Sequence, residues 1–174
     1  LQLSSTTSQV AETLSGLQIH PFSSLASWRN NDCLVSVKGY SNYVWHSENC
    51  CSRNKHGGYD SHGQLNILVE SSSTSSQEAS GLLYEDGYLW NYVPGATTAD
   101  ISTTDLGAFT NWSTQTSTFA GGVVQNNNTG VFAMELIDNT LISGFNFKKS
   151  FFFFNNNQIV ALGSGITNTS SSNT

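Results

Sequence analysis

The chain has 174 residues, enough for one domain with a sizeable hydrophobic core. Only 10% of its residues are charged, against roughly 25% in a typical soluble domain, and Ser, Thr, Asn and Gln supply the polarity instead. The net charge of −6 argues against nucleic acid, which needs a basic face, and no stretch approaches the roughly 20 apolar residues of a membrane span. A polar, weakly charged surface of this kind is typical of extracellular proteins, so we expect a secreted chain whose signal peptide has been removed.

The composition predicts short strands along most of the chain. Residues 1–17 are rich in Ser and Thr and are expected to form a polar extension before the domain. From Cys33 onward, β-branched and aromatic residues gather in runs separated by polar turns, which is typical of strands. The expected strands lie at Leu34–Val37, Tyr40–Trp45, Gln64–Glu70, Gly81–Trp90 and Val123–Val124.

The C-terminal third carries the strongest strand signals. Residues 130–137 are apolar on both faces and predict a central strand that is covered on both sides. Phe151–Phe154, Asn155–Asn157 and Gln158–Leu162 predict a hairpin, because Asn tolerates the left-handed backbone of tight turns. Gly163–Gly165 is expected to end the last strand.

Together these elements predict an all-β fold, a large antiparallel β-sandwich with very little helix. The expected domain spans residues 18–166, and residues 167–174 are expected to form a polar C-terminal tail.

Three cysteines are present, an odd number for a secreted protein. Cys33 can form a disulfide with either Cys50 or Cys51, which leaves one thiol over. Adjacent cysteines do not have the usual spacing of zinc ligands. His46, Glu48, His56, Asp60 and His62 also lack a metal-binding spacing and are interpreted as solvated loop residues. We therefore expect no metal site and no cofactor.

Several blocks of sequence resemble, in their order and spacing, blocks in the central domain of the polysaccharide lyases that cleave chondroitin and hyaluronan. The resemblance covers residues 18–170. The blocks are Leu34–Trp45, Gly57–Gly63, Trp90–Thr98, Phe119–Gly122, Val131–Leu136, Lys149–Phe153 and Ile159–Ile166.

This resemblance implies a β-sandwich that normally stands behind a helical toroid, with the glycan bound in the groove between them. It also implies β-elimination, in which a base removes the proton α to a uronate carboxyl and an acid protonates the leaving oxygen. The family's catalytic His and Tyr belong to the toroid, so this chain alone is not expected to be an enzyme. Glu135 matches the family's active-site carboxylate, whereas Asn42 stands at the expected arginine position and cannot pair with a substrate carboxylate as a guanidinium does.

Aromatic side chains and glycosylation motifs complete the candidate sites. Aromatic residues stack on sugar rings, although in a sandwich they are more often core residues. The candidates for glycan contact are Trp45, Tyr59, Trp90 and Tyr92, and the sequons are at Asn111, Asn127 and Asn168.

Two functions from different classes follow, with a third as a further alternative. The main expectation is a non-catalytic extracellular module that self-associates or binds other extracellular chains, in which a tail, residues 1–17 or 167–174, adds a strand to a neighbour and so builds filaments. The alternative is the central fragment of a lyase for uronate-containing glycans, and the further alternative is a carbohydrate-binding module.

Overall fold

The computed structural model describes residues 15–30, 33–47, 56–81, 88–107, 113–138 and 142–169. These residues form two four-stranded antiparallel sheets with very little helix, as expected. The first sheet has the order β1-β2-β3-β4, made of Gly16–His20, Leu25–Arg29, Cys33–Lys38 and Gln64–Val69. The second has the order β5-β6-β7-β8, made of Ala120–Gln125, Thr129–Asp138, Phe145–Phe154 and Gln158–Asn168.

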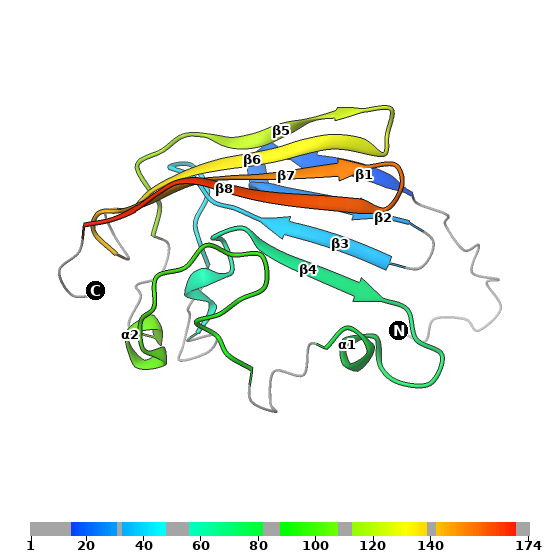
Figure 1. The fold of residues 1–174 in the computed structure, drawn as a ribbon, viewed down its shortest axis with the longest axis horizontal. Helices are drawn as coiled ribbons and strands as arrows, with labels where there is room; N and C mark the ends of the chain where they lie inside the picture. Colours follow the sequence, from blue (N-terminus) through cyan, green and yellow to red (C-terminus); the bar gives the residue numbers. More distant parts are fainter. Residues whose placement is uncertain are drawn as a thin grey trace, which may run out of the picture.

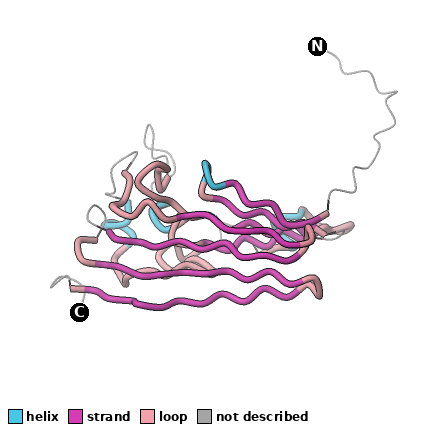
Figure 2. The backbone as a smooth tube through the Cα atoms, turned by 90° about the horizontal axis from the view of Figure 1, so that it is seen from above, coloured by secondary structure: helices cyan, strands magenta, loops and turns pink. Residues whose placement is uncertain are grey.

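Both sheets are simple meanders, so each strand pairs with its neighbour in sequence. Figure 2 shows that the strand axes of the two sheets are nearly aligned with each other, as in an aligned sandwich. The chain between β4 and β5 carries the short helices α1 (Ser76–Ala79) and α2 (Thr103–Gly107), and both helices lie on the side of β4 that is away from β5 (Figure 1). Two single 3-10 turns, η1 (Pro21–Ser23) and η2 (Gly57–Tyr59), complete the described elements. No helix among the described residues is long and apolar enough to cross a membrane.

Alternation along β6 and β7 builds the interface between the sheets. Every second residue of these strands is buried, and the buried set is almost entirely aromatic or aliphatic. One core cluster joins residues of the first sheet to Phe132, Phe151 and Phe153. A second cluster joins Met134, Leu136, Phe145 and Phe147 to loop residues that include Tyr40, Tyr59 and Leu106.

The hairpin expected near the C-terminus is confirmed, with Phe154 opposite Gln158 and Asn157 at a φ of 62°. The end of its second strand was predicted wrongly. Strand β8 runs through Gly163–Gly165 to Asn168, because a register irregularity opposite Asn146 and Lys148 absorbs the glycine segment without ending the pairing.

Other predictions for single strands have mixed outcomes. The strands at residues 64–70 and 123–124 and the central strand at 130–137 are confirmed, although only the inner face of β6 is deeply buried. Residues 40–45 form bends rather than a strand, because the backbone there pairs with the loop at residues 113–117 instead of with a sheet. Most of the strand expected at 81–90 lies outside the described residues, and β1 and β2 had no prediction.

The buried amide of Gln115 ties the end of the first sheet to the second. Its Nε2 donates to the carbonyl oxygens of Tyr40, at 2.8 Å, and of Glu135, at 2.9 Å. Its Oε1 accepts from the backbone N–H of Ile137 at 2.8 Å. One side chain therefore satisfies three backbone groups from two parts of the fold.

His62 occupies the centre of the second core cluster. Its ring is fully buried and lies 5.7 Å from the ring of Tyr40 and 4.9 Å from that of Tyr59. The ring Nδ1 lies 3.2 Å from the Thr97 carbonyl oxygen. Burial lowers the pKa of His62 to about 4, against an opposing effect from buried Asp138 and a supporting one from His46. Two residues earlier, burial raises the pKa of Asp60 to about 6.

We predict that Gln115→Leu lowers the free energy of unfolding by about 3 kcal/mol or more, since three backbone groups lose their partner. Urea unfolding measures this loss. Gln125→Leu, at the exposed end of β5, is the matched control and should change stability little. Equal stability of the two variants would contradict the bridging role of Gln115.

We also predict opposite pH responses from His62 and Asp60. The folded pKa of His62 lies below its unfolded value of about 6.5, so its contribution to stability is lost as the pH falls from about 6.5 to about 4. The folded pKa of Asp60 lies above its unfolded value, so Asp60 makes the protein more stable as the pH falls over nearly the same range. Asp60→Asn should therefore lose about 3 kcal/mol of unfolding free energy between pH 7 and pH 4, whereas His62→Phe should gain stability over that range. A flat profile for Asp60→Asn would contradict a neutral, buried His62.

Candidate functional site

Glu135 lies near the middle of β6 and faces the outer side of the second sheet, away from the core. Its neighbours in sequence, Met134 and Leu136, point inward and are buried. The Oε2 atom of Glu135 accepts a hydrogen bond from the Ser117 hydroxyl at 3.2 Å. The carboxylate is therefore held at a fixed position on an otherwise accessible face.

Lys148 stands directly opposite Glu135 in the register of β6 and β7. Its Nζ lies 3.6 Å from Glu135 Oε1, and the side chains are 66% and 32% exposed for Lys148 and Glu135 respectively. A cross-strand pair this open to water contributes little to stability. The ammonium group of Lys148 therefore remains accessible to an anionic ligand.

Asn42 lies close to Glu135 through the same serine. Its backbone N–H donates to the Ser117 carbonyl oxygen at 2.8 Å, while the Ser117 hydroxyl binds Glu135. The structure thus brings together the two residues that the resemblance assigned to the active site. The Asn42 side chain is exposed and carries no charge.

A surface hollow of about 440 Å³ opens beside this group. Its walls come from β6, β7, β8 and the residue before β5, and they combine one charge pair with one aromatic ring and two hydroxyls. The lining residues are Phe119, Ala133, Met134, Glu135, Lys148, Ser150 and Ser164. Such a lining suits a polar, partly anionic ligand that offers both hydroxyl and carboxylate groups.

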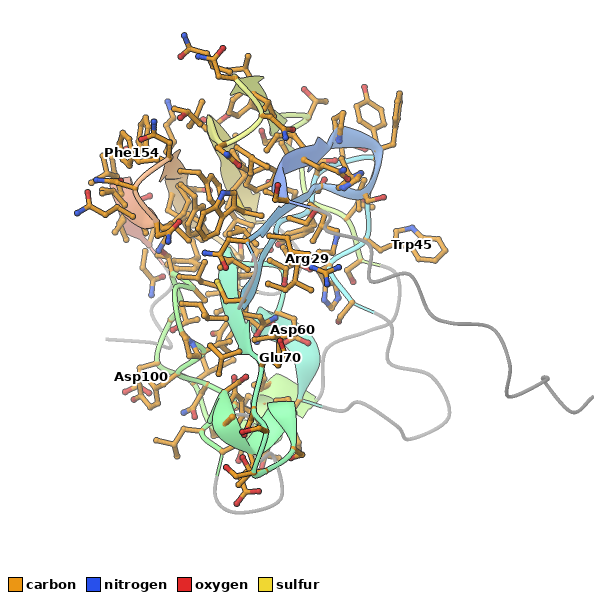
Figure 3. All side chains as sticks on the ribbon, turned by 90° about the vertical axis from the view of Figure 1, so that its right-hand side faces the viewer. Arg29, Trp45, Asp60, Glu70, Asp100 and Phe154 are labelled. Carbon is orange, nitrogen blue, oxygen red and sulfur yellow. The ribbon has the colours of Figure 1, made fainter. Side chains whose placement is uncertain are left out.

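The aromatic candidates are dispersed. Trp45 is 53% exposed and projects away from the body of the domain (Figure 3). Tyr92 is exposed and donates its hydroxyl to Asp100 at 2.8 Å, and Trp90 is half-buried against the core. Tyr59 was a wrong candidate for glycan contact, because its ring is fully buried and its hydroxyl donates to the Ala99 carbonyl oxygen. None of these four residues lines the hollow beside Glu135.

The interpretation of the histidine stretch as solvated loop is wrong for His46 and His62. Both rings are buried, because the chain at 40–46 and 56–63 folds into the core rather than over the surface. Among the described residues, no group of three or more His, Cys, Asp or Glu side chains could hold a metal ion.

Several of the residues predicted to carry sites lie outside the described segments. Cys50 and Cys51 are among them, so the pairing of Cys33, which begins β3, remains a prediction. Asn111 is also outside. Asn127 lies in the exposed turn between β5 and β6, where its Nδ2 donates to the Ser15 carbonyl oxygen at 3.3 Å, and Asn168 is exposed at the end of β8.

Sequence reasoning missed Lys148 and Ser117. Lys148 was assigned no role, because its position opposite Glu135 depends on the pairing register of β6 and β7. Ser117 sits in a polar stretch, residues 113–118, that has no distinguishing pattern. The alternation of β7 was the available signal for Lys148, since Phe147 and Lys149 had to face inward together.

Relatives of known activity resemble this chain over most of its length. The chondroitin sulfate ABC exolyase of Bacteroides thetaiotaomicron is 28% identical over 151 residues, which cover 81% of this chain and 15% of that enzyme. The chondroitin sulfate ABC exolyase of Proteus vulgaris is 30% identical over 146 residues, which cover 78% of this chain and 14% of the enzyme. The chain therefore spans about one-seventh of the length of these relatives.

Solved structures show the same fold. A Paenibacillus xanthan lyase superimposes with a TM-score of 0.74 at 22% identity, over 91% of this chain and 14% of that one. The chondroitin AC lyase of Streptomyces coelicolor A3, in complex with chondroitin sulphate, gives a TM-score of 0.66 at 21% identity, over 88% of this chain and 20% of that one. The model of polysaccharide lyase family 8, super-sandwich domain, matches residues 16–174. The two-sheet fold, the relatives and this match together establish that the chain belongs to the super-sandwich domains of polysaccharide lyase family 8.

Proposed function

We propose that this chain serves as the sandwich domain of a polysaccharide lyase that cleaves a uronate-containing glycan by β-elimination. The observation that carries the proposal is the hollow in which Glu135, oriented by the Ser117 hydroxyl, and Lys148 lie together on an accessible sheet face. The curated relatives are enzymes of chondroitin sulfate, an acidic glycan, and their name supports an acidic substrate here.

The elimination needs three catalytic groups, and this chain supplies one of them. A base must remove the proton α to the uronate carboxyl, an acid must protonate the leaving oxygen, and a cation must stabilise the charge that builds up on the carboxyl group. The exposed ammonium group of Lys148 is placed to pair with that carboxyl group. It would take the part that the neutral amide of Asn42 cannot perform.

Glu135 then acts in two ways. Its Oε1 holds Lys148 in position, and its Oε2, already oriented by Ser117, can accept a hydrogen bond from a sugar hydroxyl. The base and the acid would be the His and Tyr that the family carries on its helical toroid. In this proposal the sandwich binds and polarises the uronate, and the proton transfers occur on the facing domain.

We predict that Lys148→Met and Glu135→Gln each lower the rate of elimination by the natural gene product on chondroitin sulfate at least tenfold, because each removes a charged contact to the reacting sugar. Ultraviolet absorbance of the newly formed double bond measures the rate. Glu70→Gln is the matched control, since Glu70 is exposed and lies away from Phe154 and the second sheet (Figure 3). Unchanged turnover in both site variants would show that the hollow of Glu135 and Lys148 takes no part in the reaction.

The setting of the domain is proposed on chemical grounds. A surface of low charge that is rich in hydroxyl and amide groups suits an extracellular protein. We propose that the chain is secreted and that Asn168, exposed at the end of β8, carries a glycan if its source glycosylates proteins.

A second function, as a non-catalytic assembly module, is favoured by the exposure of β8. This strand is the edge of the second sheet among the described residues, and none of its side chains is charged. Natural sheets usually protect such an edge with charges or bulges. The register irregularity of β8 lies near Gly165, so the uncharged segment before it is the part open to an added strand from a neighbouring chain. The self-association expected from the sequence would use this edge, and the added segment would come from the parts of residues 1–17 or 167–174 that lie outside β1 and β8.

If β8 accepts a strand from a neighbour, concentrated protein should form filaments visible by electron microscopy, with a repeat near one domain length. Leu162→Lys should abolish them, because a charge on the exposed edge opposes strand addition. Lys148→Met, one strand inward, serves as the control and should leave filaments intact. A monodisperse monomer of the unsubstituted chain at high concentration would contradict the assembly function.

A further inference from the structure

A second hollow, of about 520 Å³, lies beside the entry to β5 and is lined by uncharged side chains alone. Two exposed aromatic rings flank it: Phe22, 97% exposed, and Tyr43, 78% exposed. Phe22 comes from the turn between β1 and β2, and Tyr43 comes from the bends after β3. Two parts of the chain that are separate in sequence thus present their most exposed rings to one space.

The backbone under Phe22 is fixed by a lysine. Lys38 Nζ donates to the carbonyl oxygens of Ser23 and Gly39, each at 2.8 Å. Within the turn, the Ser24 N–H donates to the Pro21 carbonyl at 3.1 Å, and the Gly39 N–H donates to the Ser24 carbonyl at 2.7 Å. Phe22 is therefore held facing solvent by a rigid turn, although it buries almost no surface in the fold.

The backbone under Tyr43 is fixed in a similar way. Its N–H donates to the buried Ser41 hydroxyl at 3.1 Å, and the Ser41 N–H donates to the Val44 carbonyl at 3.1 Å. The backbone that carries each ring is thus ordered before any ligand arrives, so binding does not have to order it.

The chemistry of the lining selects the ligand. Aromatic faces, a threonine hydroxyl and no charge suit a ring that has apolar C–H faces and hydroxyl edges. An uncharged pyranose ring has both. A folded protein partner would need roughly 800 Å² on this surface, far more than a hollow flanked by two rings provides.

The two hollows share one stretch of chain. Thr118 and Ala120 line the aromatic hollow, whereas Phe119 between them lines the hollow of Glu135 and Lys148. The Phe119 carbonyl also accepts the Glu135 N–H at 3.0 Å, so the stretch that lines both hollows is fixed against β6. We propose that the hollow of Phe22 and Tyr43 is a second subsite that binds an uncharged sugar ring of the same glycan whose uronate reaches Lys148. This inference rests on the proposed function for the identity of the glycan.

The test uses saturation-transfer NMR on the 174-residue chain with a chondroitin hexasaccharide, in which uronate and N-acetylgalactosamine alternate. We expect the strongest saturation on the N-acetylgalactosamine ring protons. In the double variant Phe22→Ala/Tyr43→Ala this saturation should disappear and the Kd should rise about tenfold, because two stacking faces are lost. Tyr43→Phe should retain the saturation of the N-acetylgalactosamine ring and the Kd, since the face of the aromatic ring remains.

Trp45→Ala is the matched control, because Trp45 is an exposed aromatic residue that lines neither hollow. It should leave the saturation pattern and the Kd unchanged. Unfolding curves of all variants verify that the fold is intact, as expected for such exposed side chains. An equal loss in Trp45→Ala, or no saturation transfer from the unsubstituted chain to the hexasaccharide, would overturn the subsite.

Lys148→Met separates the inference from the proposed function. Elimination is measured with the natural gene product. If Lys148→Met abolishes elimination there while Phe22→Ala/Tyr43→Ala leaves the saturation and the Kd of the 174-residue chain unchanged, the subsite is overturned and the function stands. If elimination is unaffected by Lys148→Met but the double variant loses saturation of the N-acetylgalactosamine ring, the uronate role fails and the subsite stands.

Discussion

The amide of Gln115 fixes the geometry on which both hollows depend. The first sheet ends at Tyr40 and the second presents Glu135 and Ile137, and one buried side chain satisfies a backbone group at each of these positions. Because a buried backbone group without a partner costs about 1–3 kcal/mol, this arrangement leaves little freedom in how the two segments approach. Ser117, two residues later, consequently lies where it can bind Asn42 with its carbonyl group and Glu135 with its hydroxyl.

The core around His62 stabilises the same end of the sandwich by other means. A neutral imidazole is packed among tyrosine and phenylalanine rings, so polar and aromatic groups share one cluster. The cluster holds the loops at 56–63 and 93–99 against β7. These loops leave the outer face of the second sheet uncovered, and that is where Glu135 and Lys148 are found.

Local patterns predicted the strands better than they predicted the site. The alternation in residues 130–137 and the Phe and Asn runs at 151–157 depend on neighbouring residues only, and both led to correct strands. The burial of Tyr59 and His62 depends on loops that enter the core, and a sequence pattern carries no information about such a path. Glu135 came from a family resemblance, whereas Lys148 required the pairing register of two long strands. Phe22 had one unused signal, a bulky aromatic directly after the proline of a turn.

The division of the chain into two consecutive meanders has a consequence for how the protein folds. Strands β1 to β4 and strands β5 to β8 each pair only with sequence neighbours, so either sheet can form from hairpins that close quickly. The slow event is then the docking of two preformed layers, since it closes the long segment between β4 and β5. Gln115 lies at the end of that segment. Its bonds to Glu135 and Ile137 can form with β6 alone, whereas its bond to the Tyr40 carbonyl forms only after docking. The hollow of Phe22 and Tyr43, which takes its lining from both halves of the chain, would therefore mature last, whereas the hollow of Glu135 and Lys148 needs only the second sheet and the residue before β5.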